Sequence, residues 1–497
     1  MRAKRGVGGT YENVGSAHTI TGGNLGNNVT ITLTKAQFEG ITGLTEGDEV
    51  YFTAVITDLA GNSTTGTQSA NTLIFDIVPP TATTIASRTA VTAPIVANYF
   101  NASNTAVDVV INIPNDATLV GGNVKLQART NANSFVDVAV TTNAIANGDL
   151  GATKTITVAK TGTANTDLQE LSGWESGVTL DFRAVLEDAA GNSTYGTTYT
   201  PTMNVDLNAP AAPVFTLNGG TCINESNVTT VSFTVSGEAN ATVSYTVADA
   251  GNVHTTTGTT TLNGSGNGSV TGINLTSFND GTITVSGTQT DLAGNVSPSG
   301  NDTENKDTDD AGITTLTLTS SNFLNMYAKN GQTLTLAIDA DEDVTVTAAT
   351  IEGNDVIGTL DNAGDADAST WRVTWTVAGV TTGNTGVFSI TLQDACGNTV
   401  TFTQADLTGT NVTYDNTAPS VSSIVRYNPS GQYTNADNPV FRVTFDEPVE
   451  ITDNNAFAFS GTCTGTPAVQ SSTGVSGQLG ATALYTTWDV TVNGITN

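Results

Sequence analysis

Polar and apolar residues alternate along this chain, and the clearest alternation stands directly before a phrase that occurs four times. The phrase reads DLAGN at 58–62, DAAGN at 188–192, DLAGN at 291–295 and DACGN at 394–398. The side chains six, four and two residues before its leading Asp are Phe52, Ala54, Ile56; Phe182, Ala184, Leu186; Val285, Gly287, Gln289; and Phe388, Ile390, Leu392. A period of two predicts a strand with one buried face. We expect that burial in three of the four copies, with the third copy weaker.

Further runs alternate in the same way, at 230–235 (TVSFTV), 333–338 (TLTLAI) and 441–445 (FRVTF). Thr, Val and Ile dominate these runs, Gly, Asn and Asp separate them, and no amphipathic helix of any length is predicted. Short strands with regular turns, in units of about 100 residues, are typical of immunoglobulin-like β-sandwiches. The predicted fold class is therefore all-β, a tandem array of immunoglobulin-like β-sandwich domains in an elongated rod. The Trp and the paired Cys of an antibody domain are missing.

The predicted domains follow the spacing of the repeated phrase, which gives modules of about 100 to 130 residues. A second phrase closes most of them, DIVPP from Asp76, DLNAP from Asp206 and DNTAP from Asp415, while residues 306–312 (KDTDDAG) lack the Pro. Since Pro cannot donate to a β-ladder, it ends the last strand and stiffens the linker. The predicted domains are 1–78, 79–208, 209–310, 311–417 and 418–497.

The two end domains are expected to be incomplete. Residues 23–35 (GNLGNNVTITLTK) match residues 148–160 (GDLGATKTITVAK), so 1–78 resembles the later half of 79–208. The last segment, 418–497, stops before any copy of the repeated phrase. We therefore expect a piece of a longer array.

Composition narrows the classes of function. The 497 residues include 46 acidic and 15 basic side chains, and the formal net charge is -31. Such a surface repels nucleic acid and anionic lipid, and it suits bound cations. Cys222, Cys396 and Cys463 fall one to a module, which excludes a disulfide framework inside any module. No apolar stretch is long enough for a membrane span, and the first residues lack the apolar core of a signal peptide.

Acidic residues are predicted to converge at the junctions between modules. In an immunoglobulin-like sandwich the repeated phrase would form the turn between the last two strands, F and G, beside the preceding linker. The turn after the second strand, B, lies at the same end. The second junction would thus gather Asp206, Glu238, Asp291 and Asn295. Two carboxylates about 5 Å apart repel by roughly 3 kcal/mol at an effective dielectric near 20.

A divalent cation would turn this repulsion into attraction, and Ca²⁺ prefers oxygen ligands in loose geometry. We therefore predict interdomain calcium. The predicted ligands at the other junctions are Asp76, Asp116, Asp188 and Asn192; Asp307, Asp309, Asp341, Asp343, Asp394 and Asn398; and Asp415 and Asp446. The alternative is that the Asp of each phrase accepts hydrogen bonds from its own turn, which needs no metal.

The sequence contains few of the residues and motifs that enzymes use for catalysis. We therefore expect no enzyme activity and no catalytic residues. The two histidines, His18 and His254, lie in different modules, and no GxSxG, HExxH or CxxC spacing occurs. Cys396 is interpreted as a small, partly buried residue of its turn, with a reactive thiol as the minor alternative. Trp371 and Trp375 alternate on one strand face and are predicted to belong to the core rather than to a carbohydrate platform.

Three stretches carry a family resemblance, at 206–215 (DLNAPAAPVF), 235–247 (VSGEANATVSYTV) and 280–297 (DGTITVSGTQTDLAGNVS). They resemble the bacterial immunoglobulin-like repeats of large cell-surface adhesins and biofilm proteins. That resemblance implies extracellular stalks on the bacterial surface, often stiffened by calcium at linkers, which present a distal binding domain. It carries the metal role to the leading Asp188, Asp291 and Asp394 of the phrases and to the linker residues Asp76, Asp206 and Asp415.

The predicted function is therefore a structural stalk segment that mediates cell adhesion or biofilm formation. Its predicted partners are neighbouring repeats and an adhesive target, a glycan or a surface protein, with no nucleic acid and no membrane span. The alternative is that its modules bind a glycan or another ligand directly, possibly as accessories to a secreted polysaccharide-degrading enzyme. Exposed aromatic side chains clustered on one module would favour that alternative.

Overall fold

The computed structural model describes residues 1–139, 143–161, 167–362, 368–451, 456–458, 464–471 and 485–496. Strands dominate this part of the chain, and α1 (Lys35–Glu39) is its one α-helix. Single 3-10 turns are η1 (Gly22–Asn24), η2 (Ala117–Leu119), η3 (Asn147–Asp149), η4 (Leu168–Glu170), η5 (Asn218–Gly220), η6 (Ala250–Asn252), η7 (Ile357–Thr359) and η8 (Gln404–Asp406). None of the helices described has the length and apolar character needed to cross a membrane. The predicted all-β class is confirmed.

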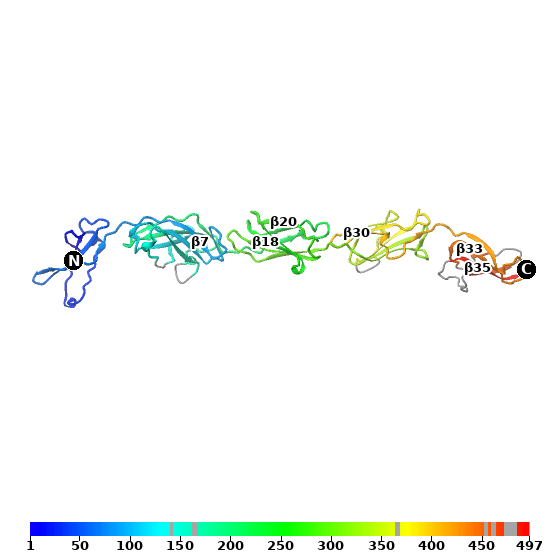
Figure 1. Cartoon of the computed structure of the whole chain (residues 1–497), viewed down its shortest axis with the longest axis horizontal. Helices are drawn as coiled ribbons and strands as arrows, with labels where there is room; N and C mark the ends of the chain where they lie inside the picture. Colours follow the sequence, from blue (N-terminus) through cyan, green and yellow to red (C-terminus); the bar gives the residue numbers. More distant parts are fainter. Residues whose placement is uncertain are drawn as a thin grey trace. The chain divides into compact units, whose positions relative to one another are not determined.

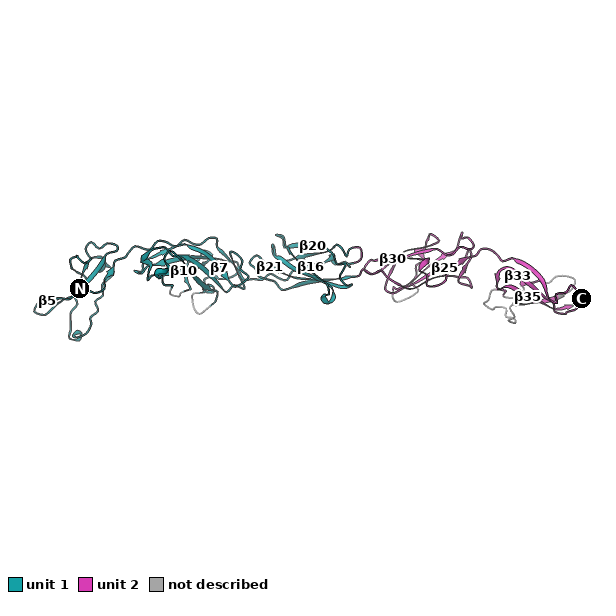
Figure 2. Cartoon of the chain, in the orientation of Figure 1, with its two compact units in different colours: residues 1–223, 227–306 teal, residues 224–226, 307–497 magenta. Residues whose placement is uncertain are grey.

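Figure 1 traces the chain from its N-terminus to its C-terminus, and Figure 2 shows the two compact units into which it divides. The first contains Met1–Ile223 and Asn227–Lys306, and the second contains Asn224–Ser226 and Asp307–Asn497. The short segment Asn224–Ser226 thus belongs to the second unit, where it lies against the turn at residues 394–398.

Residues 79–208 form two sheets. The smaller has the order β12 (Thr153–Ala159), β9 (Ala106–Asn112), β7 (Ile85–Val91). The larger has the order β11 (Val136–Val138), β10 (Asn123–Thr130), β13 (Thr179–Glu187), β15 (Met203–Asp206), β8 (Tyr99–Asn101), and β14 (Ser193–Tyr195) pairs with β13. Alternate residues of β9 and β13, such as Val109, Ile111 and Phe182, are fully buried in one core. Period-two patterning therefore produces the predicted sandwich.

The next sandwich is built alike. Its sheets are β16 (Val214–Leu217), β17 (Val231–Ser236), β20 (Asn267–Ile273), and β19 (Thr255–Thr261), β18 (Thr242–Ala248), β21 (Gly281–Thr290), β22 (Gly300–Lys306). Phe233 lies at the centre of its core, with edge-on ring contacts to Phe215 at 5.6 Å and to Tyr245 at 4.8 Å between centroids. Such ring pairs contribute beyond the area that they bury.

A third complete sandwich lies in the second unit. Its sheets are β23 (Ile313–Ser320), β25 (Thr333–Ala340), β28 (Thr370–Thr376); β27 (Asn354–Asp355), β26 (Thr345–Ile351), β29 (Phe388–Gln393), β30 (Thr399–Thr403); and the pair β24 (Tyr327–Ala328), β31 (Thr413–Tyr414). Trp371 and Trp375 pack against its core, and the indole N–H of Trp371 donates to the Ala368 carbonyl at 2.8 Å. Their prediction as core residues is confirmed.

The end segments each contribute one larger sheet. The first contains β2 (Glu12–Asn13), β1 (Arg2–Arg5), β3 (Glu49–Thr53), β6 (Leu73–Ile74) and the separate pair β4 (Val55–Thr57), β5 (Ser63–Thr65). The last contains β32 (Val421–Asn428), β33 (Val440–Val449), β35 (Tyr485–Thr496), β34 (Thr464–Ser471).

The burial predicted for the strands before the repeated phrase is wrong at the first copy. Ile56 is 58% exposed, because β4 and β5 form a hairpin of their own and the segment has a small core. The third copy, where the pattern was weaker, is buried instead. Val285 is fully buried, and buried Gln289 donates to the Ala211 carbonyl and accepts from the Glu238 amide.

Candidate functional site

The repeated phrase forms a tight turn held by its own Asp. In the third copy, Asp291 Oδ1 accepts the amides of Ala293 and Asn295, both at 2.8 Å. Its Oδ2 accepts the side-chain amide of Asn295, also at 2.8 Å. Gly294 has φ +94°, a left-handed conformation that favours Gly. The turn lies after β21, and the predicted hydrogen bonds from the turn to its own Asp are present.

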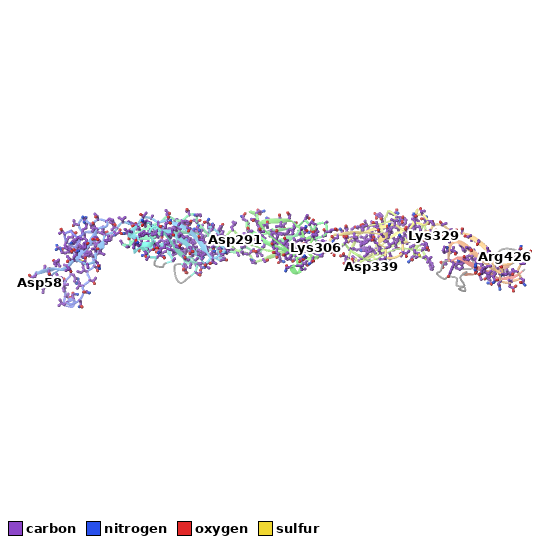
Figure 3. The ribbon with its side chains drawn as sticks, in the orientation of Figure 1. Asp58, Asp291, Lys306, Lys329, Asp339 and Arg426 are labelled. Atoms are coloured by element: carbon purple, nitrogen blue, oxygen red, sulfur yellow. The ribbon has the colours of Figure 1, made fainter. Side chains whose placement is uncertain are left out.

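The first copy forms the same turn at an exposed site, and its leading Asp58 is labelled in Figure 3. Asp58 accepts the amides of Ala60 and Asn62 at 3.0 and 2.7 Å and the Asn62 side chain at 2.9 Å, yet the residue is exposed. Hydrogen bonds from Asn62 hold the pKa of Asp58 below its ordinary value. Asp291 makes the same bonds but is 8% exposed. The turn therefore forms on its own, and burial comes from what packs on it.

Three of the turns contact the preceding linker through their final Asn. The side-chain amide of Asn295 donates to the Asp206 carbonyl at 3.1 Å. Equivalent bonds join Asn192 to the carbonyl of Asp76 at 3.1 Å and Asn398 to the carbonyl of Asp307 at 2.9 Å. The linker and the repeated turn thus meet at each of these junctions, as the alternation pattern and the topology predicted.

A second tie was not found from the sequence, and we call it the Asn clasp. The side-chain amide of Asn101 donates to the Ala293 carbonyl, and the Ala102 amide donates to Asn295 Oδ1, both at 2.9 Å. Asn101 is completely buried. Because the neighbouring residue Ala102 bonds with the same turn, Asn101 and Ala102 hold the repeated turn in addition to the linker.

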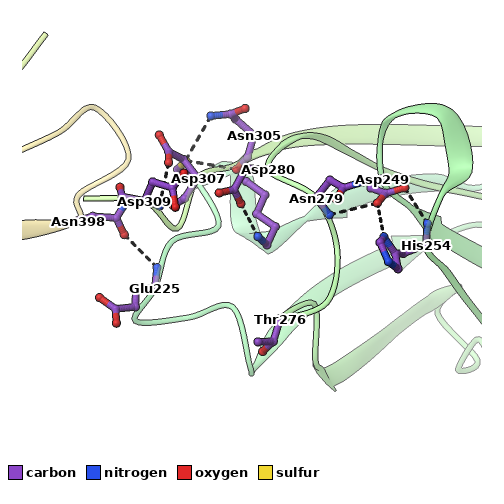
Figure 4. A network of polar contacts seen from close by, with 12 residues as sticks. Glu225, Asp249, His254, Thr276, Asn279, Asp280, Asn305, Asp307, Asp309 and Asn398 are labelled. Carbon is purple, nitrogen blue, oxygen red and sulfur yellow. Dashed lines mark hydrogen bonds and ion pairs between the residues drawn. The ribbon is translucent and has the colours of Figure 1, made fainter. Parts of the chain in front are cut away.

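The second unit contains a matching clasp (Figure 4). The side-chain amide of Asn224 donates to the Cys396 carbonyl at 2.8 Å, and the Glu225 amide donates to Asn398 Oδ1 at 3.0 Å. Both clasps begin an N-x-S-N phrase, NASN at 101–104 and NESN at 224–227. That recurrence is the sequence signal that could have revealed them.

Pairing of β8 with β15 places Asn101 opposite the linker residue Asp206. β24 pairs with β31 in the same parallel way, and continuing that register by one residue places Lys329 opposite the linker residue Asp415. A Lys therefore stands where the other two modules have the clasp Asn. The fourth linker is bordered by a different side chain from the second and third.

Acidic side chains also lie close together at the junctions, and one acid at each junction has a raised pKa. Burial raises the pKa of Glu238, and the charges of Asp291 and Asp206 raise it further. Asp206 is itself bonded, since its Oδ1 accepts the hydroxyl of Ser176 at 3.1 Å. Two of the carboxylates predicted for the second junction, Asp206 and Asp291, therefore lie close enough for their charges to act on the third, Glu238.

The third and fourth linkers repeat this arrangement. Burial raises the pKa of Glu342 most. This pKa is raised further by the charges of Asp307, Asp394, Asp341 and Asp309. Burial likewise raises the pKa of Glu447, followed by the charge of Asp415.

The first linker follows the same rule with a different acid. Burial raises the pKa of Asp76, then the charges of Asp188 and Glu46. Predicted Asp116 is not among those charges, because its Oδ1 accepts the amide and hydroxyl of Thr118 and begins η2. Glu46 Oε2 instead accepts the Ile77 amide of the linker at 2.9 Å.

Two further predicted residues have other surroundings. Asp343 is exposed and takes no part in the described cluster, where Glu342 lies instead. Asp341 Oδ1 accepts the Gly312 amide at 2.8 Å, which fixes the direction of that acidic run. Asp446 accepts the amide and hydroxyl of Ser420, which lower its pKa, and it stays within range of Glu447.

The negative charge of the junctions would attract a cation, but the described side chains do not surround a cation site. Within the described ranges, no three His, Cys, Asp or Glu side chains are grouped closely enough to hold a metal ion. Asn295 uses both ends of its amide on protein partners, so it crosslinks the junction, and its role as a calcium ligand stays a prediction. The carboxylates of Asp206, Glu238 and Asp291 are left as the oxygens that could hold Ca²⁺, which also accepts main-chain carbonyls and water.

The cysteines and histidines differ in what they do. Cys222 and Cys396 are both disulfide-bonded, so the alternative of a reactive thiol at Cys396 is wrong, whereas Cys396 is partly buried in its turn as predicted. Cys463 lies outside the described residues. His254 Nδ1 lies 2.7 Å from Asp249 Oδ2 (Figure 4). Although burial opposes it, bonds from His254 and Asn279 lower the pKa of Asp249 to about 2. His18 is exposed.

The raised pKa values predict how stability depends on pH without divalent ions. A carboxyl whose pKa is higher in the folded chain stabilises it most when protonated, and that stabilisation is lost as the pH rises through the folded value. We therefore expect the melting temperature in chelator to fall as the pH rises from about 4.5 towards 7. Glu238→Gln should reduce this fall, and a melting temperature that rises throughout this range would contradict the expectation.

Comparison with known proteins finds solved structures with low sequence identity and low TM-scores. No family model matches the chain, and no curated protein matches it. Among solved structures, part of a 1.5-MDa bacterial ice-binding adhesin is 20% identical, with 64% of this chain and 93% of that chain covered and a TM-score of 0.32. A Ca²⁺-stabilized adhesin with which an Antarctic bacterium binds ice is 22% identical, with 74% and 81% covered and a TM-score of 0.34. A tetra-tandem repeat from the extending region of a large adhesion protein is 18% identical, with 76% and 84% covered and a TM-score of 0.24.

Proposed function

We propose that this chain is a structural stalk segment of a repeat-containing bacterial surface adhesin, extracellular and without enzymatic activity. Its modules would act mechanically, presenting a binding domain at a distance from the cell in adhesion or biofilm formation. The observation that carries the proposal is the repeated junction. Linker, repeated turn and clasp meet through the same bonds at Asn295 and at Asn398.

The construction of the junction supports stiffness. Asn295 bonds with the Ala102 amide on one side and with the Asp206 carbonyl on the other. Groups that are buried and fully bonded resist displacement, because breaking them leaves desolvated donors and acceptors. A linker held in this way should resist bending between the two modules that it joins.

Calcium would complete the same joint. Burial raises the pKa of Glu238, and the charges of Asp291 and Asp206 raise it further, so these carboxylates repel Glu238 when it is ionised. A divalent ion removes this repulsion, with the weak affinity of about 10⁻⁴ to 10⁻³ M usual for extracellular modules. Asp76 with Asp188, Glu342 with Asp307, and Glu447 with Asp415 would hold ions at the other linkers.

Melting and small-angle scattering, with Ca²⁺ and with chelator, test this proposal. Ca²⁺ at about 1 mM should raise the melting temperature and increase the longest dimension of the chain. Glu238→Gln should reduce the response, whereas Glu170→Gln removes the same charge from an exposed site outside the junctions and should leave it unchanged. Identical melting and scattering curves in Ca²⁺ and in chelator would contradict the role of calcium. Scattering from a compact particle under both conditions would contradict the proposed stalk.

A further inference from the structure

The outer face of the larger sheet in residues 79–208 has an unusual composition for so acidic a chain. Even-numbered residues of β10 and β13, such as Leu126 and Phe182, face the core, so the odd-numbered residues face outwards. In the register of the two strands Gln127 lies opposite Arg183 and Arg129 lies opposite Asp181. Two arginines on neighbouring strands thus share this face.

Aromatic rings lie between and beside these arginines. The guanidinium carbon of Arg129 lies 4.4 Å from the centroid of the Phe135 ring, and that of Arg183 lies 4.3 Å from the same ring. Arg183 also lies 4.6 Å from the ring of Tyr195 on β14. We call Arg129, Phe135, Arg183 and Tyr195 the cation–aromatic row. Each contact of this kind restrains both side chains.

The guanidinium groups of the row keep donors for a ligand. Arg183 donates from Nε to Gln127 Oε1 at 2.8 Å, and Arg129 donates from Nε to Asp181 Oδ2 at 3.1 Å. No bond joins their terminal nitrogens to the described residues. A guanidinium has five N–H donors in a planar fork that matches a carboxylate.

The acids on this face are already engaged. Glu187 pairs with Lys125 at 2.6 Å, and Asp137 accepts from Gln127 at 2.7 Å. Asp181 is 6% exposed and receives Arg129. Each of these acids thus has a protein donor, although Oδ1 of Asp181 has none, and within the described residues no carboxylate bonds with the terminal nitrogens of Arg183.

Tyr195 supplies the apolar part of the site. It is 57% exposed, whereas Trp371 and Trp375 pack against a core. An exposed ring held against a guanidinium offers a flat apolar surface beside a carboxylate-binding fork, with little rotamer freedom left to lose on binding.

We propose that the cation–aromatic row binds a carboxylate-bearing glycan. The ring of Tyr195 would stack on the apolar face of a sugar, and Arg183 would bind its carboxylate. A peptide bound by strand addition would need an open sheet edge for main-chain bonds, and a sheet face offers none. This site is independent of the junctions and of calcium, and it would give the stalk a lateral contact with an acidic polysaccharide.

The test is a titration of the full chain with oligogalacturonate, monitored by NMR or calorimetry. The buffer contains a chelator, so that divalent ions at the junctions cannot contribute to binding. Binding should exceed that of a neutral galactose oligomer at least tenfold. Arg183→Gln and Tyr195→Ala should each weaken it about tenfold, the loss expected for one charged or stacked contact. Arg183→Lys keeps the charge without the fork and should also weaken it.

Arg442→Gln is the matched control. Arg442 also stacks on a ring, 3.4 Å from the centroid of Tyr427, but Asp489 accepts two of its nitrogens at 2.8 Å. That variant should bind as the original chain does, and circular dichroism verifies that each variant is folded. Equal binding of the neutral oligomer, equal binding of poly-glutamate, or unchanged binding by folded Arg183→Gln and Tyr195→Ala chains would each overturn the proposal.

Discussion

Replacement of Asp291 by Ala is expected to weaken the repeated turn at the second junction by about 4 kcal/mol, because three N–H donors lose a charged acceptor at a buried site. Hydrogen exchange reports this locally. The amides of Ala293 and Asn295 should exchange about a thousandfold faster in the variant, at about 1.4 kcal/mol per factor of ten. Core amides such as that of Phe233 should keep most of their protection, because no bond of the core is removed.

Asp58→Ala is the control for this result. Asp58 makes the same three bonds in a turn that is exposed, so water replaces the lost acceptor and its amides should be accelerated much less. The difference between the two variants measures what burial at the junction adds. Equal acceleration at both turns would mean that the junction adds nothing.

Asn295→Ala is expected to cost about 3 kcal/mol, and the loss should appear on both sides of the junction. The variant removes bonds to the Asp206 carbonyl, to Asp291 Oδ2 and from the Ala102 amide. The Ala102 amide should therefore exchange faster, although it lies almost two hundred residues away in the sequence. A structural role confined to the turn would leave that amide unchanged.

Two comparisons sharpen this prediction. Asn62→Ala removes only the bond to the Asp58 side chain and should affect its own turn alone. In a double-mutant cycle, Asn101→Ala and Asn295→Ala should be less damaging together than their separate costs predict, because both act on one clasp. Simple additivity of the two would separate the clasp from the turn.

The sequence was sufficient for the strands and for the place of the repeated turn, since both depend on local patterns. Alternation with a period of two specified the inward faces of β13 and β29, and the D-x-x-G-N spacing specified the Asp-held turn. At Ile56 the same local pattern failed. Burial there depends on a second layer packing on the strand, and alternation alone does not report that layer.

Junction residues were harder to choose because neighbouring acids look alike in a sequence. Residues 341–343 are all acidic, yet the Gly312 amide binds Asp341 and thereby turns Glu342 towards Asp307 and leaves Asp343 in solvent. Glu46 was missed because it precedes strand β3 and not the linker. Its role depends on a bond to Ile77 across thirty-one positions.

The Asn clasp was missed for a similar reason. Asn and Ser are abundant in this chain, so an N-x-S-N phrase does not stand out until strand pairing places it beside a linker. A search for phrases shared by modules at equal distance from the linker would be ambiguous, because Lys329 replaces the Asn in one module.

The clasp has a consequence for inheritance. It holds main-chain atoms and an Asn of the repeated turn, so the second and third junctions are made by the same kinds of residue on both sides. A recombination event that deletes or duplicates the whole module between these two junctions would again join matching halves. The number of such modules can then change without any new interface having to evolve.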